Sequence, residues 1–224
     1  MTNRTLVVTG GHGILGKAVV EAALAQGLNV ALIDHATGKA PDGALEIGGV
    51  DLTDAGATGA AMAKVVERFG GIDALLNVAG GFVWQTTEDA RPAWDRMFAL
   101  NLTTALNASR GALPHLKRSD EGRIVNVGAN AALKSAAGMG AYAASKAGVH
   151  RLTESLAEEL KDTSVTVNAV LPSILDTAQN RADMPDADPA KWVAPADLAR
   201  VMLFLASPES RAITGALIPV TGRI

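Results

Sequence analysis

The sequence predicts an α/β fold in which helices cover both faces of one doubly wound parallel sheet of about seven strands. Short runs of β-branched residues alternate with longer Ala-rich stretches, the order that gives parallel strands joined by right-handed helical crossovers. Hydrophobic residues make up 48% of the chain but aromatic residues only 4%, and such an aliphatic core suits a sheet buried on both faces. A chain of 224 residues fits a single domain over residues 1–224.

Each strand is expected where Val, Ile and Leu cluster, and each helix where an Ala-rich stretch follows. The expected strands are residues 6–9, 29–34, 45–50, 73–78, 123–127, 165–171 and 216–220. The expected helices are residues 13–26, 53–69, 92–116, 141–160 and 195–206. Residues 173–194 do not fit this alternation. Because a long irregular segment in a compact domain is usually functional, we expect a substrate lid there; the alternative is a surface loop with one short helix.

The overall composition excludes several classes of protein. A formal charge of −3 and a pI near 5.8 give no reason to expect nucleic acid or an anionic membrane as a partner. The chain has no cysteine, which excludes disulfides, thiolate metal sites and a cysteine nucleophile, and we expect no metal. Neither a signal-peptide pattern nor a bilayer-spanning apolar stretch is found, so a soluble cytoplasmic protein is expected.

A glycine-rich turn separates the first expected strand from the first helix. It reads Thr-Gly-Gly-His-Gly-Ile-Leu-Gly over residues 9–16. In that place a turn lets bare backbone approach a pyrophosphate, and the helix N-terminus offers unpaired N–H groups. A glycine cluster alone is often only a turn, but here an acidic residue follows about twenty positions later. We therefore expect a dinucleotide at this turn, bound by Gly10, Gly13, Ile14, Leu15 and Gly16.

Two acidic residues follow the second and third expected strands. Asp34 ends the second strand, where a carboxylate accepts hydrogen bonds from ribose hydroxyls and repels a 2′-phosphate. NAD(H) is therefore expected to be preferred, and NADP(H) stays possible because protonated His12 or His35 would soften that preference. Asp51 and Leu52 follow the third strand, where they would contact the adenine. The alternative for Asp51 is the N-cap of the next helix.

Tyr142 and Lys146 stand four residues apart on one face of an expected helix. A free tyrosine has a pKa of about 10 and transfers protons poorly at neutral pH. A nearby ammonium favours the phenolate and brings that pKa toward the working range. This spacing alone is usually structural, but Tyr142 is the only tyrosine, and its helix starts at the sheet edge where doubly wound folds bind ligands. We therefore expect a catalytic pair, followed from Val149 onward by an apolar core stripe.

In this order, the motifs resemble the short-chain dehydrogenase/reductase family of Rossmann-type enzymes, over nearly the whole chain. Asn-Val-Ala-Gly at 77–80 and Thr-Gly at 214–215 also match. The residues that the resemblance places at the cofactor are Ala79, Gly80, Gly81, Pro172 and Thr177. It further implies that Asn101 supports a proton-relay water beside Lys146 and so belongs to the catalytic set. Members of the family usually associate through two long helices, which implies a homodimer or homotetramer.

Two departures from the family pattern narrow the resemblance. The turn reads Gly-x-x-Gly-x-x-Gly, and Ala129 occupies the position of the family's catalytic serine. Both departures are typical of the dihydropteridine reductase branch, which Val-Ala-Gly-Gly at 78–81 and Leu-Asp-Thr at 175–177 also resemble. That branch reduces quinonoid dihydropterins with NADH, and a conjugated substrate of this kind makes a serine dispensable. Phe82 stands where the branch has a tryptophan.

The leading hypothesis is an NADH-dependent reductase of dihydropteridine reductase type, with Tyr142 as proton donor. The residues expected around a planar substrate are Phe82, Trp84, Ala129, Met184 and Trp192. For the aromatic side chains, packing or a subunit contact is the alternative. A second hypothesis is a carbonyl reductase or alcohol dehydrogenase of the same family, in which Asn130, Ser135 or water replaces the serine. A third is a dinucleotide sensor without turnover, against which the retained Tyr142 argues.

Overall fold

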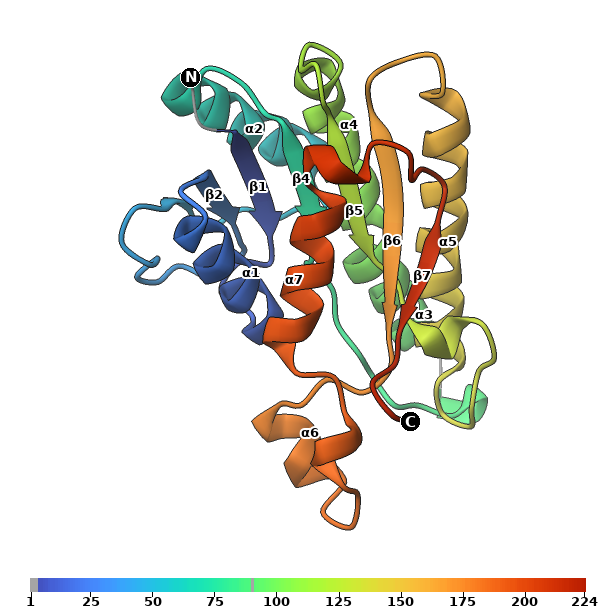
Figure 1. Cartoon of the computed structure of the whole chain (residues 1–224). Helices are drawn as coiled ribbons and strands as arrows, with labels where there is room; N and C mark the ends of the chain where they lie inside the picture. Colours follow the sequence, from blue (N-terminus) through green and yellow to red (C-terminus); the bar gives the residue numbers. More distant parts are fainter. Residues whose placement is uncertain (1–3, 90) are drawn as a thin grey trace.

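The computed structural model describes residues 4–89 and 91–224. Within them, seven parallel strands form one sheet in the order β3-β2-β1-β4-β5-β6-β7 (Figure 1). The strands are β1 (Thr5–Thr9), β2 (Asn29–Ile33), β3 (Leu45–Ile47), β4 (Ala74–Asn77), β5 (Arg123–Val127), β6 (Thr166–Pro172) and β7 (Leu217–Val220). The winding runs from β1 to β3, then crosses to β4 and continues to β7. The predicted α/β class with a doubly wound parallel sheet is confirmed.

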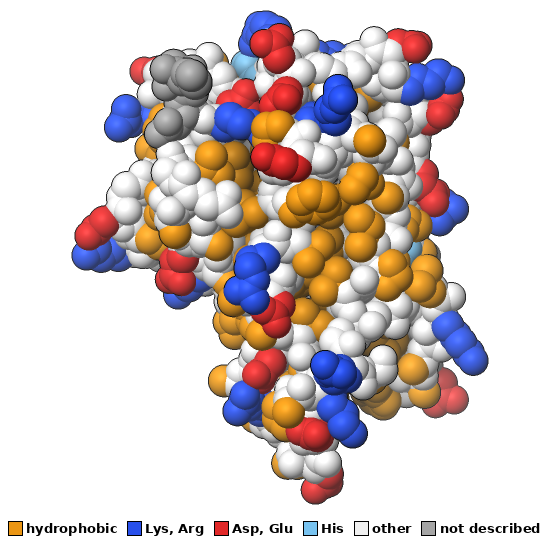
Figure 2. Space-filling model, in the orientation of Figure 1, with side chains coloured by type: hydrophobic (Ala, Val, Ile, Leu, Met, Phe, Trp, Pro, Cys, Tyr) orange, Lys and Arg blue, Asp and Glu red, His pale blue; other side chains and the backbone are white. Residues whose placement is uncertain are grey.

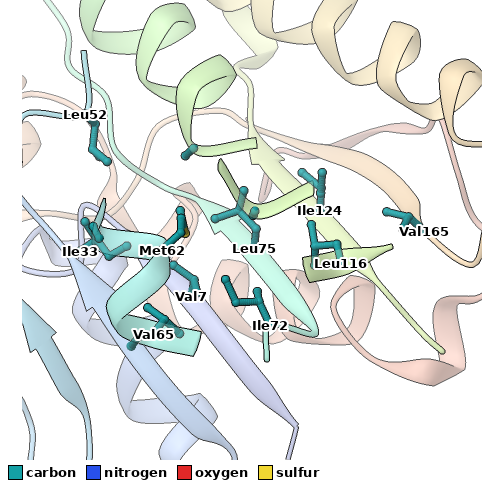
Figure 3. Close-up of a cluster of buried hydrophobic side chains, with 14 of the residues drawn as sticks. Val7, Ile33, Leu52, Met62, Val65, Ile72, Leu75, Leu116, Ile124 and Val165 are labelled. Carbon is teal, nitrogen blue, oxygen red and sulfur yellow. The ribbon is translucent and has the colours of Figure 1, made fainter. Parts of the chain in front are cut away.

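Helices cover both faces of this sheet (Figure 1). They are α1 (Ile14–Ala25), α2 (Ala55–Phe69), α3 (Arg91–Met97), α4 (Thr104–Leu116), α5 (Gly140–Glu159), α6 (Ala178–Asp183) and α7 (Pro195–Leu205). On one face, apolar side chains of α2, α4 and the end of α5 pack against the strands, and Figure 3 shows part of that cluster. On the other face α1 and α7 lie side by side. Both clusters are built mainly from Val, Ile, Leu and Ala, as the low aromatic content predicts.

The reversal of the winding falls between β1 and β4, and it fixes where a ligand can bind. Thr9 at the end of β1 pairs with Ile33 of β2 on one side and with Asn77 of β4 on the other. The carboxyl ends of these strands therefore meet at one edge of the sheet. Open α/β sheets bind ligands in the crevice at such a reversal.

Residues 92–116, predicted as one helix, are interrupted. A π-helical turn, η2 (Phe98–Thr103), separates α3 from α4. Just after it, the hydroxyl of Thr104 donates to the Leu100 carbonyl at 2.7 Å. Within the turn, the Asn101 side chain is held by residues from distant parts of the chain. π-Turns inside helices are rare and occur frequently at functional sites. The π-turn therefore indicates a functional role for this part of the chain, which lies near the carboxyl edge of the sheet.

The segment 173–194 is more ordered than its sequence predicts. It holds α6 and a short 3₁₀ turn, η4 (Pro189–Lys191), and its two ends are joined by a β-bridge between Leu175 and Val193. Thr177 caps α6 by accepting the Asn180 N–H at 3.1 Å. In Figure 1 α6 projects away from the sheet, below the carboxyl ends of the strands. The segment thus forms a short helical projection whose two ends are joined by the Leu175–Val193 bridge.

Candidate active site

A cleft of about 890 Å³ lies at the sheet edge where the winding reverses. It runs from the turn after β1, past the ends of β2 and β4, to the start of α5. The sequence-predicted residues that line it are Gly10, Gly13, Ile14, Leu15, Gly16, Asp34, Asp51, Leu52, Ala79, Gly80, Gly81, Phe82, Tyr142 and Lys146. The predicted residues that lie outside this lining are Trp84, Asn101, Ala129, Pro172, Thr177, Met184 and Trp192. The fold thus brings the glycine turn and the tyrosine–lysine pair into one hollow.

The glycine turn has a shape that only glycine permits at two positions. A Cβ on Gly16 would lie 2.1 Å from the Gly10 carbonyl oxygen, and one on Gly10, whose φ is +67°, would lie 2.8 Å from Ala79 backbone atoms. α1 begins at Ile14, and its N-cap residue, Gly13, provides no side-chain hydrogen bond. The first N–H groups of α1 are therefore free to bind an anion in the cleft. This cradle fits the pyrophosphate of a dinucleotide.

The carboxylate of Asp34 is held in place beside that turn. One of its oxygens accepts the His12 N–H and the other accepts the Ala36 N–H, both at 2.9 Å. The imidazole of His12 in turn lies 2.9 Å from Glu46, whose carboxylate also accepts the Gly38 N–H. These contacts lower the pKa of Glu46, the Gly38 hydrogen bond most. A fixed carboxylate at the end of β2 is the geometry that favours ribose hydroxyls over a 2′-phosphate.

The two alternatives for Asp51 are resolved in part. Asp51 lines the cleft, and its carboxylate accepts both the N–H and the hydroxyl of Thr53, which lowers its pKa. The N-cap of α2 is Asp54, which accepts the N–H groups of Gly56 and Ala57. The interpretation of Asp51 as the helix cap is therefore wrong. Its neighbour Leu52 is buried but reaches the same cleft.

Tyr142 and Lys146 lie in the first two turns of α5, and both reach the cleft. Lys146 is 5% exposed, and its ammonium donates to the Val127 carbonyl at 2.7 Å. Burial lowers its pKa from 10.5 to about 8, and burial raises the pKa of the Tyr142 phenol to about 12. Both shifts have one cause, because a charge is costly where water is excluded. The phenol is therefore protonated at neutral pH, and the charge of the lysine is easier to remove than in water.

Asn101 lies behind the cleft and binds the loop after β4. Its Oδ1 accepts the Gly81 N–H at 2.9 Å, and its Nδ2 donates to the Gly81 carbonyl and to the Ser145 hydroxyl. A Cβ on Gly80 would lie 2.6 Å from that Oδ1 and 3.3 Å from Lys146 Nζ. Asn101 therefore ties the loop that lines the cleft to α5, close to the lysine ammonium.

The polar face of α5 continues beyond Lys146, which the sequence analysis missed. His150 and Thr153 follow at helical spacing and are buried. Lys146, His150 and Thr153 are bonded to Val127, Ala129 and Asn126 respectively, at the end of β5. The expected apolar stripe is present at Val149, Leu156 and Leu160, but this second, polar stripe lies beside it. The sequence pattern that indicates this stripe is a polar residue at each of positions i, i+4, i+8 and i+11, counted from Tyr142.

Of the residues predicted at the substrate, one lines the cleft and the others lie outside its lining. The Phe82 ring meets the Tyr142 ring edge-on, with centroids 5.0 Å apart, and both line the cleft. Trp84 is 61% exposed and lies against Gly138, where a Cβ would approach its ring to 2.1 Å. Trp192 is buried at the base of the 173–194 segment, whereas Met184 follows α6. Of the residues predicted at the substrate, Phe82 is therefore the one that lines the cleft.

Comparisons with known proteins agree with this geometry. Residues 4–188 match the family described as short chain dehydrogenase. The chain is 32% identical to 2-(S)-hydroxypropyl-CoM dehydrogenase 3 of Xanthobacter autotrophicus, over 99% of this chain and 96% of that protein. It is 34% identical to the 3-oxoacyl-[acyl-carrier-protein] reductase MabA of Mycobacterium tuberculosis, over 98% and 92%. The structure of a Brucella melitensis 3-ketoacyl-(acyl-carrier-protein) reductase complexed with NADH superimposes with a TM-score of 0.86 at 26% identity, covering 99% of this chain and 98% of that one.

Fold, site and relatives together define an NAD(P)-dependent oxidoreductase on a Rossmann-type sheet. The chain belongs to the short-chain dehydrogenase family. The expected family and enzyme class are confirmed, whereas the branch, the substrate and the cofactor preference stay predictions. In the part of the chain that the structure describes, no helix is long and apolar enough to cross a bilayer. Within those same residues, no group of three or more His, Asp or Glu is placed to hold a metal ion.

Proposed function

We propose that the protein is an NADH-dependent reductase of dihydropteridine reductase type, acting on a quinonoid dihydropterin or a similar conjugated ring. The observation that carries the proposal is Ala129, which occupies the family's serine position. Its side chain is 2% exposed and has no hydrogen-bond donor. Losing a donor at a developing oxyanion costs a ketone reductase a hundredfold or more in rate. A substrate that takes hydride into a conjugated imine develops no such oxyanion, so a methyl group is compatible with turnover.

The cofactor would lie along the cleft described above. Its pyrophosphate would meet the free N–H groups at the start of α1, and its adenosine ribose would meet Asp34. Asp51 and Leu52 would flank the adenine, while Ala79, Gly80 and Gly81 would pass beside the second ribose. Pro172 and Thr177 are proposed to meet the nicotinamide end, although they lie outside the present lining. When bound, the reduced nicotinamide would supply the hydride that the reaction consumes.

The chain itself supplies and controls the proton. Tyr142 holds a proton at its hydroxyl, since burial raises the pKa of the phenol to about 12. Lys146 on the same helical face, protonated below a pKa of about 8, favours the phenolate that forms when this proton moves to the substrate. Asn101 holds the Gly80–Gly81 loop against that lysine. Hydride and proton together add the two electrons and two hydrogens that convert an imine into an amine.

The walls of the cleft favour a flat substrate. The Phe82 and Tyr142 rings stand nearly perpendicular, at 84°, and so leave an aromatic face and an aromatic edge toward a bound ring. Trp84, docked on Gly138 beside the start of α5, is proposed to extend this wall. Ala129 lies outside the present lining and is proposed to face the bound ring with its methyl group, and Met184 and Trp192 belong to the segment proposed as a lid. A pterin presents the planar, conjugated shape that this arrangement accepts.

Oxidation of NADH, followed by its absorbance, tests the proposal. We expect turnover with quinonoid dihydropterin, at least a hundredfold loss in the Tyr142→Phe variant, and little turnover with a 3-oxoacyl thioester. Ala129→Ser is the matched variant, since it restores the family's donor at the position of the methyl group. A large gain on the thioester in Ala129→Ser, with no dihydropterin activity in the wild type, would assign the protein to ketone reduction. NADH binding without turnover on either substrate would instead favour a sensor.

Ketone or alcohol chemistry is the second candidate, and the relatives favour it. The similar proteins named above are a dehydrogenase of a hydroxyalkyl thioether and reductases of oxoacyl groups. If this chain shares that chemistry, another donor must replace the serine. Ser135 is exposed, and its hydroxyl is turned to the Ala136 carbonyl at 3.3 Å, whereas Asn130 is only half-buried, next to Ala129. Asn130 is thus the better replacement, and Asn130→Ala would abolish ketone turnover under this alternative.

A homo-oligomer is proposed from an exposed apolar patch on the surface and from the assembly that is usual in the family. On the face in Figure 2, hydrophobic side chains gather over α7 and β7, where Phe204 is 47% exposed and Leu217 and Ile218 are half-buried. Leu106 on α4 is also exposed, at 36%. Exposed apolar patches of this kind mark protein interfaces. A homodimer or homotetramer is therefore proposed, with light scattering as its test, and the cytoplasmic location stays a prediction.

A further inference from the structure

The imidazole of His150 is a buried titratable group that the proposed proton transfer does not use. It lies on α5 one turn beyond Lys146 and is 2% exposed. Its Nε2 accepts the Ala129 N–H at 3.3 Å, and a Cβ on Gly128 would lie only 2.5 Å from that nitrogen. The ring is thus packed directly against the backbone that carries Ala129. A glycine at position 128 is what permits this approach.

The same stretch of backbone holds the catalytic lysine. The Val127 carbonyl accepts a hydrogen bond from Lys146 Nζ at 2.7 Å, and the Gly128 N–H donates to the Val170 carbonyl at 2.9 Å. Val127, Gly128 and Ala129 therefore each have one backbone group fixed, and two of the three bonds come from α5. If the Ala129 bond were lost, the Gly128 bond would still join this backbone to β6, but the residues after β5 would be held less firmly, and the Val127 carbonyl would be placed with less precision.

We propose that His150 is a positioning residue: by accepting the Ala129 N–H it holds the end of β5, and so sets the carbonyl that orients the Lys146 ammonium. The inference rests on the proposed role of Tyr142 and Lys146 in proton transfer. Where the sequence lacks the family's serine, an imidazole below the backbone orders the strand end. The alternative, simple core packing, requires only the volume of the ring and not its acceptor nitrogen.

The role requires a neutral ring, because only an unprotonated Nε2 can accept a hydrogen bond. Burial lowers the pKa of His150 most, and the positive charges of Arg151 and Lys146 on the same helix lower it further. From β5 the ring faces the backbone of Gly128 and Ala129. The proton of the neutral ring therefore belongs on Nδ1.

Nitrogen NMR of the imidazole rings tests this assignment without any substrate. The chain has four histidines, and the signal that disappears in His150→Gln belongs to His150. We expect an Nδ1–H tautomer that stays neutral at pH 6.5, the ordinary pKa of a histidine. An Nε2–H tautomer, or a ring that is charged at pH 7, overturns the proposal. This result is independent of whether the proposed function is right.

A matched pair of variants tests the effect on the lysine. Gln offers a carbonyl oxygen near the position of Nε2, whereas Met has the same chain length without that acceptor. We expect His150→Met to lower kcat about tenfold to a hundredfold with little change in the KM for NADH, and His150→Gln to recover most of the rate. The exposed Glu159→Met variant is the control on the same helix. Equal rates in the Met and Gln variants overturn the proposal, since packing alone then accounts for the residue.

The pKa of Lys146 gives a readout when no substrate is active. The carbon shifts of ¹³C-labelled lysine report its titration, which is expected near pH 8 in the wild type. In His150→Met we expect a midpoint shifted by about half a pH unit or more, and in His150→Gln a midpoint close to the wild type. An unchanged midpoint in both variants contradicts the link between His150 and Lys146. Loss of turnover in Tyr142→Phe, measured separately, reports on the proposed function itself.

Discussion

Replacing Lys146 with methionine should stabilise the protein while abolishing catalysis. The pKa of Lys146 falls from 10.5 to about 8 on burial, and each pH unit corresponds to about 1.4 kcal/mol. The charged ammonium therefore costs the folded state about 3 kcal/mol. Methionine removes that cost but leaves the Val127 carbonyl without its donor, which costs about 1 kcal/mol. The net gain near pH 7 is about 2 kcal/mol, or about 4–8 °C in Tm for a chain of this size.

The stability gained in Lys146→Met must disappear as the pH rises, and this pH dependence identifies the buried charge of the lysine as its cause. Below pH 8 the lysine is protonated in both the folded and the unfolded states, so the folded state bears the full cost. Between pH 8 and 10.5 the folded state has released the proton while the unfolded state keeps it, so the wild type gains stability with pH. At pH 10.5 the cost is nearly gone, and the variant should be no more stable than the wild type.

Urea unfolding of Lys146→Met and wild type at pH 7 and pH 10.5 measures both quantities. Lys64→Met, at an exposed position on α2, controls for the general effect of removing a lysine. We expect the Lys146 variant to be more stable than the wild type at pH 7 but not at pH 10.5, while the control variant stays close to the wild type at both. A variant that is less stable than the wild type at pH 7 would refute the reasoning, as would a gain that persists unchanged at pH 10.5.

Three further predictions concern the cradle and the scaffold. Gly16→Ala should abolish NADH binding, measured by fluorescence, because its Cβ would lie 2.1 Å from the Gly10 carbonyl oxygen; normal affinity would contradict the steric role. Asp34→Ala should weaken NADH binding about tenfold or more and NADPH binding much less, since the repelled 2′-phosphate no longer meets a carboxylate; equal losses for both cofactors would argue against a selective role. Asp54→Ala should lower the free energy of unfolding by about 1 kcal/mol, because it removes the N-cap of α2, while kcat stays at the wild-type value; an unchanged urea midpoint would show that the cap contributes nothing.

The features that could be predicted from the sequence are those set by neighbouring residues. A buried run of β-branched residues favours a strand. A glycine such as Gly16 indicates that two backbone segments approach closely, because a side chain would not fit between them. The parallel, doubly wound class of the sheet follows from alternating strands and helices joined by right-handed crossovers. The glycine turn and the start of the Tyr142 helix were expected at the carboxyl edge of that sheet, and the cleft lies there.

The features that could not be predicted depend on contacts between distant residues. The π-turn at Phe98–Thr103 accompanies hydrogen bonds from Asn101 to Gly81 and Ser145, which are 20 and 44 residues away. Nothing local distinguishes it from a regular helix. The segment 173–194 contains two prolines, Pro185 and Pro189, and its sequence looks irregular, but the Leu175–Val193 bridge closes its base. His150 lies beside the expected apolar stripe, and its partner at Ala129, 21 residues earlier, is what shows that the ring accepts a hydrogen bond.

The polar stripe on α5 joins the helix that carries Tyr142 and Lys146 to the sheet by buried hydrogen bonds, in a core poor in aromatic side chains. Asn77 donates to Asn126 at 2.8 Å, and Asn126 donates to Thr153 at 2.8 Å, so β4, β5 and α5 are joined by one buried chain of hydrogen bonds. Such a network tolerates little rotation of the helix, because each displaced donor or acceptor would be left buried and unpaired. The stripe thus fixes the direction in which Tyr142 and Lys146 leave the helix.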